Sequence, residues 1–60
     1  MTSPVAPLLV LQARAQARAL LFANGEIASI EQAMLPLFRY AAEEDIPMPT
    51  AQAIIEQAFK

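Results

Sequence analysis

Residues 8–23 carry the pattern that most constrains the fold, LLVLQARAQARALLFA. Ala, Leu, Gln and Arg favour helix over strand. At about 100° per residue, Gln12 and Gln16 fall on one line of this helix, and Arg14 and Arg18 fall on a second line nearly opposite. Apolar residues fill both flanks between the lines. A helix on the surface of a single chain needs only one apolar stripe, so the second flank predicts contact with another chain.

The two flanks have similar composition. Flank A comprises Leu9, Val10, Ala13, Ala17, Leu20 and Leu21, and flank B comprises Leu8, Leu11, Ala15, Ala19 and Phe22. We expect the other helices to cover flank A, and a second copy or another protein to cover flank B. The predicted interface therefore contains Leu8, Leu11, Arg14, Ala15, Arg18, Ala19 and Phe22. The alternative is that alanine serves only as a good helix former and that one flank faces water.

The length of the chain supports association. Sixty residues allow one domain, and a domain of that size buries only about 60% of its unfolded surface. The sequence has no Cys and no His, so neither a disulfide nor a Cys/His zinc site stabilises it. Oligomerisation is the remaining common source of stability for a small scaffold, and a hydrophobic content of 57% fits it.

The charges are unevenly distributed over this small acidic protein, whose net charge is −2. Residues 1–25 contain two arginines and no acid, whereas residues 26–60 contain six acids against Arg39 and Lys60. Nucleic-acid binding usually requires a clustered basic face, so no nucleic-acid partner is expected.

Local signals predict three helices. We expect residues 1–7 to form an irregular arm and residues 8–60 to form a single helical domain. The first helix, over residues 8–24, ends at Asn24-Gly25, where glycine favours the left-handed C-cap. A capping box at Ser29 starts the second helix, over residues 30–44, and Pro36 kinks or breaks it.

The prolines after the second helix predict an extended spacer over residues 46–49. Thr50 is the predicted N-cap of a third helix over residues 51–59. The expected fold is therefore an all-α, three-helix domain that forms a homodimer through its first helix.

No residue pattern indicates catalysis, a cofactor or a metal, because His, Cys, a glycine-rich loop and a carboxylate pair with divided acid and base roles are missing. The run Glu43-Glu44-Asp45 is a candidate for docking a basic partner surface or for pairing with the two arginines of the first helix. The alternative is that the acidic run and the two arginines are exposed to water and bind no partner.

These observations predict a non-enzymatic protein–protein interaction module, either a homo-oligomeric adaptor or regulator or a subunit of a larger assembly. The alternative is a small DNA-associated regulator, antitoxin-like or phage-type, that uses the second and third helices as a divergent helix-turn-helix. No secretory signal and no span of about 18 uninterrupted apolar residues is evident. We therefore expect a soluble, cytoplasmic protein without a membrane partner.

Overall fold

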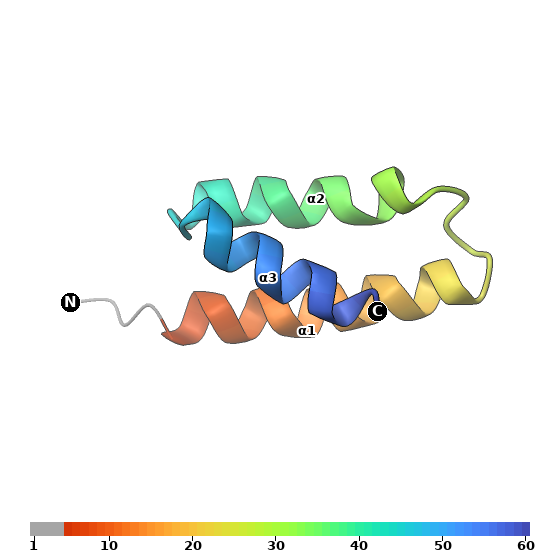
Figure 1. The fold of residues 1–60 in the computed structure, drawn as a ribbon, viewed down its shortest axis with the longest axis horizontal. Coiled ribbons are helices and arrows are strands. Elements are labelled where there is room, and N and C mark those ends of the chain that lie inside the picture. The colour runs from red at the N-terminus through yellow and green to blue at the C-terminus, as the bar shows by residue number, and fades with distance from the viewer. Residues whose placement is uncertain (1–4) are drawn as a thin grey trace.

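The computed structural model describes residues 5–60, which form three helices joined by short turns (Figure 1). Helix α1 spans Val5–Ala23, α2 spans Ile30–Glu43 and α3 spans Met48–Ala58. α1 and α2 run antiparallel, and α3 packs against both, with its C-terminal end over α1 (Figure 1). The predicted all-α class and the predicted order of three helices are confirmed.

Two helices begin earlier than predicted. α1 begins at Val5, so residues 5–7 of the predicted arm are helical, while residues 1–4 lie outside the described part of the chain. α3 begins at Met48 with Pro47 as its N-cap, so Thr50 is not the N-cap and the predicted extended spacer was wrong at residues 48–49. The reason is the same in both helices. The first turn of a helix has no use for the amide hydrogen that proline lacks, so Pro7 and Pro49 lie inside the first turns.

The C-terminal end of α1 and the N-cap of α2 form as predicted. Gly25 adopts a φ of +79°, and its N–H donates to the carbonyl of Phe22 at 3.1 Å. The next N–H, of Glu26, donates to the carbonyl of Leu21 at 2.9 Å, which completes a Schellman motif. At the start of α2, the Gln32 N–H donates to Ser29 Oγ at 3.1 Å.

The end of α2 repeats this motif with a residue less suited to it. Asp45 has a φ of +55°, in the left-handed region that glycine occupies without a steric penalty. Its N–H donates to the carbonyl of Ala42 at 3.2 Å, and the Ile46 N–H donates to the carbonyl of Ala41 at 2.9 Å. The turn brings Ile46 into the core, where it is buried.

The core is thin. Half of the buried hydrophobic residues are alanines, and Leu11, Leu37 and Ile55 are the largest fully buried side chains among residues 5–60. The full buried set is Leu11, Ala15, Ala33, Leu37, Ala41, Ile46, Ala51 and Ile55. All three helices contribute to it, and the alanines let their backbones approach closely.

A polar contact fixes α1 against α2 beside this core. Pro36 has no N–H, so it cannot donate to the carbonyl of Gln32 one turn earlier. Arg18 of α1 donates to that carbonyl from Nη2 at 2.9 Å, and its Nε donates to the carbonyl of Ala33 at 2.6 Å. α2 continues through Pro36 as one element, so the predicted break does not occur, while a kink at Pro36 stays a prediction.

Because Arg18 replaces the missing proline donor, its contribution to stability depends on Pro36. We expect Arg18→Met to lower the free energy of unfolding by about 1–2 kcal/mol. In a Pro36→Ala background, the new N–H satisfies the Gln32 carbonyl, so the same change costs clearly less. Denaturant titrations followed by far-UV circular dichroism at one protein concentration measure both values. Arg39→Met on α2 is the control. Equal losses in the two backgrounds would contradict the coupling.

The left-handed conformation of Asp45 predicts a stabilising substitution. Asp45→Gly should raise the free energy of unfolding by about 1 kcal/mol, because glycine removes the steric cost of the positive φ. Gly25→Ala should lower it by about the same amount, since an added Cβ meets no atom within 4 Å and only the backbone conformation is strained. Asp45→Asn removes the charge alone. A gain in Asp45→Asn as large as in Asp45→Gly would assign the effect to charge.

Candidate interaction surface

Flank B of α1, and not flank A, faces the other helices of the chain, and Leu11 and Ala15 of the predicted interface lie in the core, while the remainder of that interface stays a prediction. Leu11 and Ala15 are fully buried, and Leu8, Ala19 and Phe22 are half-buried. Phe22 contacts Phe59 of the C-terminal segment with ring centroids 6.2 Å apart. These residues already have partners within the chain, so Leu11 and Ala15 are inaccessible to another protein.

The two arginines of the predicted interface also contact α2. Arg18 binds backbone carbonyls as described above. The guanidinium carbon of Arg14 lies 4.4 Å from the centroid of the Tyr40 ring, which is a cation–π contact. The two arginines were predicted to pair with Glu43, Glu44 or Asp45. Arg14 instead contacts an aromatic ring, and Arg18 binds two carbonyl oxygens.

Flank A is the side of α1 that the other helices leave open. Leu20 is 66% exposed and Leu9 is 59% exposed, while Val10 and Leu21 are each 38% exposed. Ala13 and Ala17 lie between these pairs and are also exposed. At 100° per residue, the six side chains cover about 120° of the helix, and no polar residue of α1 falls in that arc. We call this surface the outer face of α1.

α1 as a whole has one property of a membrane helix. Within residues 5–60, α1 is the helix long and apolar enough to cross a membrane by length and composition alone. Core helices of soluble proteins and signal sequences meet the same criterion. The polar residues Gln12, Arg14, Gln16 and Arg18 interrupt the apolar sequence at its centre, and both arginines contact α2.

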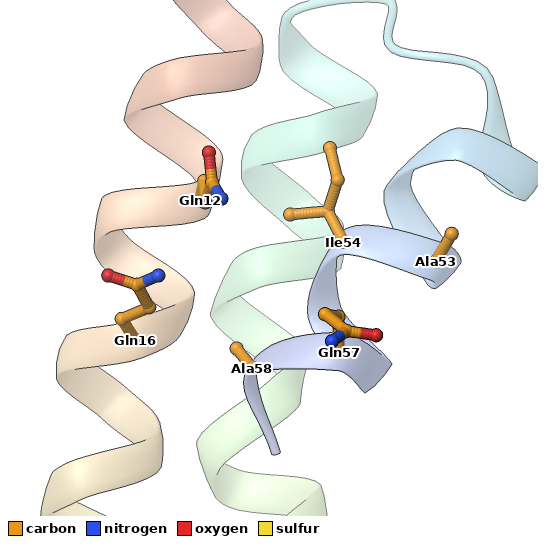
Figure 2. A pocket seen from close by; sticks show the side chains of 6 residues that line it. All are labelled: Gln12, Gln16, Ala53, Ile54, Gln57 and Ala58. Carbon is orange, nitrogen blue, oxygen red and sulfur yellow. The ribbon is translucent and has the colours of Figure 1, made fainter. Parts of the chain in front are cut away.

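A groove of about 580 Å³ runs between α1 and α3, next to the outer face (Figure 2). Gln12 and Gln16 of α1 lie on one side of it, and Gln57 of α3 lies on the other. The remaining lining residues are Ala53, Ile54 and Ala58. Amide groups donate and accept hydrogen bonds but do not titrate near neutral pH, so the groove offers binding contacts without acid–base groups.

A second apolar depression, of about 530 Å³, lies along the first half of α2. It is lined by Ser29, Ile30, Glu31, Gln32, Met34, Leu35 and Phe38. Leu35 is 60% exposed and Ile30 is 44% exposed. Met34 and Phe38 also pack against the core, so each is only partly open to this depression.

The acidic run lies exposed where α2 meets α3, so its predicted role in docking a basic partner stays a prediction. The outer side of α3 carries Gln52 and Glu56, whose side chains share a hydrogen bond of 2.8 Å. A carboxylate at that position repels phosphate, so the helix-turn-helix alternative gains no support from it. Residues 5–60 contain no group of three or more His, Cys, Asp or Glu residues placed to hold a metal.

Comparison of the chain with protein-family models, with curated proteins and with solved structures found no significant match.

Proposed function

We propose that this chain is a non-enzymatic interaction module that associates with a second copy of itself through the outer face of α1. The observation that carries the proposal is the continuous apolar arc of Leu9, Val10, Ala13, Ala17, Leu20 and Leu21, which no other helix covers. Contiguous exposed apolar surface of this kind is typical of interaction sites.

The thin core supplies a reason for association. The alanine-rich core buries little apolar volume, and the chain has no disulfide to add stability. Pairing two outer faces extends the apolar interior from one chain to the next across α1. A small scaffold gains from oligomerisation the stability that its own core lacks.

The free energy available is modest. The exposed fractions of Leu9, Val10, Leu20 and Leu21 amount to about two whole side chains in each copy. Burying four such side chains in a dimer contributes about 6–12 kcal/mol to association. The loss of translational and rotational freedom on association costs about 4–15 kcal/mol. The most favourable difference between these figures is about 8 kcal/mol, which corresponds to a dissociation constant of about 1 μM, so the dimer is no tighter than micromolar.

A membrane surface fits the outer face less well than a second copy does. Interfacial helices combine an apolar face with lysines and arginines that contact anionic headgroups. The two arginines of α1 contact α2, and the net charge of the whole chain is −2. No charged side chain lies on the outer face itself, so two copies meet there without repulsion.

Sedimentation velocity between about 10 μM and 1 mM tests the proposal, because this range spans the expected dissociation constant. We expect the sedimentation coefficient of the wild-type chain to rise with concentration. The double variant Leu9→Gln/Leu20→Gln should remain a monomer throughout, with an unchanged far-UV circular dichroism spectrum.

Leu35→Gln is the matched control, because Leu35 is as exposed as Leu9 but lies on α2. It should leave association intact. Loss of association in this variant alone would move the interface to α2. A wild-type chain that stays monomeric over the whole range would refute self-association, and co-sedimentation of that monomer with phosphatidylcholine vesicles would identify a lipid surface as the target.

A further inference from the structure

Three of the four cationic side chains of the chain lie along the seam between α1 and α2. Arg14 lies over the Tyr40 ring, and Arg18 binds two carbonyl groups of α2. Arg39 of α2 meets Arg14 at a depression of about 200 Å³. We call it the arginine depression, and it is lined by Arg14, Pro36, Arg39, Tyr40 and Glu43.

The lining residues from α2 share one side of that helix, because they follow the spacing i, i+3, i+4 and i+7 from Pro36. Arg14 reaches the same place from α1, and its contact with the half-buried Tyr40 ring holds its guanidinium group in position. Arg39 is exposed and forms no hydrogen bond and no ion pair with another residue of 5–60. Both guanidinium groups therefore have N–H donors available for an acceptor from outside the chain.

The depression has a net positive charge within an acidic chain. Its two arginines face one carboxylate, that of Glu43, which leaves a formal charge of +1. The other five acids do not line it; they are Glu26, Glu31, Glu44, Asp45 and Glu56. A single negative charge matches this site, whereas a phosphate dianion exceeds its charge and is repelled by Glu43.

We propose that the arginine depression binds the carboxylate of a glutamate or aspartate side chain presented by a partner protein. Guanidinium groups pair with carboxylates through two parallel hydrogen bonds, and Pro36 and the Tyr40 ring offer apolar contacts to the stem of such a side chain. Sites that enclose a whole small molecule have volumes of about 300–1,000 Å³, so this smaller depression suits one protruding side chain. It does not include Leu9 or Leu20, so this proposal does not depend on self-association.

Nuclear magnetic resonance titration of the ¹⁵N-labelled full chain tests the proposal. The probe is an alanine–glutamate–alanine tripeptide with both ends blocked, so that its only charge is the glutamate carboxylate. Exposed ion pairs contribute little free energy, so we expect a dissociation constant in the millimolar range or weaker, which this method can measure. The signals of Arg14, Arg39 and Tyr40 should shift and saturate. The same tripeptide with glutamine in place of glutamate should not shift them, and equal saturable shifts with both tripeptides would overturn the proposal.

Arg39→Gln is the principal variant, because Arg39 makes no ion pair or hydrogen bond within residues 5–60 and its loss leaves the fold intact. It should weaken binding of the glutamate tripeptide by about two- to fivefold, the range expected for one exposed ion pair. Lys60→Gln changes the net charge of the chain equally but lies outside the depression, so it is the matched control. Equal weakening in both variants would assign the effect to net charge and overturn the proposal.

Glu43→Gln tests the preference for a single negative charge. Removal of this carboxylate should tighten binding of the glutamate tripeptide by about two- to fivefold, and should tighten binding of inorganic phosphate by a larger factor, because phosphate carries more charge. In the wild-type chain, phosphate at the same ionic strength should bind more weakly than the tripeptide. Tighter binding of phosphate by the wild-type chain, or unchanged tripeptide binding in Glu43→Gln, would overturn the assignment of the depression to a carboxylate.

Discussion

The fold depends on a carbonyl group that proline leaves without a partner. Pro36 in the middle of α2 cannot donate to the carbonyl of Gln32, and Arg18 of α1 supplies the donor instead. The second bond of Arg18, to the Ala33 carbonyl, fixes the planar guanidinium at one position along α2. A feature that weakens an isolated helix therefore sets the register between two helices. The apolar contacts alone specify that register less sharply, because so many of them are made by alanines.

The same contact accounts for the burial of flank B, which the sequence had placed at an interface with another chain. Flank A and flank B have nearly equal apolar content, so periodicity shows that two faces exist without showing which one the chain covers. Arg18 borders flank B and reaches the carbonyl exposed by Pro36, so flank B turns inward with Leu11 and Ala15. The missing donor of Pro36 and the symmetric spacing of flank A are both visible in the sequence. Flank B is spaced as symmetrically as flank A, so the missing donor of Pro36 is the feature that relates to the inner side.

The number of helices and the motifs at Gly25 and Ser29 were easier to predict than the starts of α1 and α3. Gly25 and the N-cap Ser29 act through bonds to residues within a few positions, so the sequence shows both partners of each bond. Pro7 and Pro49 are compatible both with an extended segment and with the first turn of a helix, and only packing decides between them. The carbonyl groups that Arg18 binds and the Tyr40 ring that Arg14 contacts depend on how α1 packs on α2. The positions of the two arginines in the sequence therefore do not reveal these partners.

The strained turn at Asp45 also bears on which part of the molecule opens most readily. α3 follows this turn, has 11 residues, and has as its N-cap Pro47, which makes no side-chain hydrogen bond. Apart from its backbone connection, it is held mainly by apolar contacts such as those of Ala51, Ile55 and Phe59. Segments with few anchoring bonds detach at a lower free energy than the whole domain unfolds. Transient release of α3 would leave the pairing of α1 with α2 in place and expose Leu11, so local opening gives the chain a route to uncover its core without losing its fold.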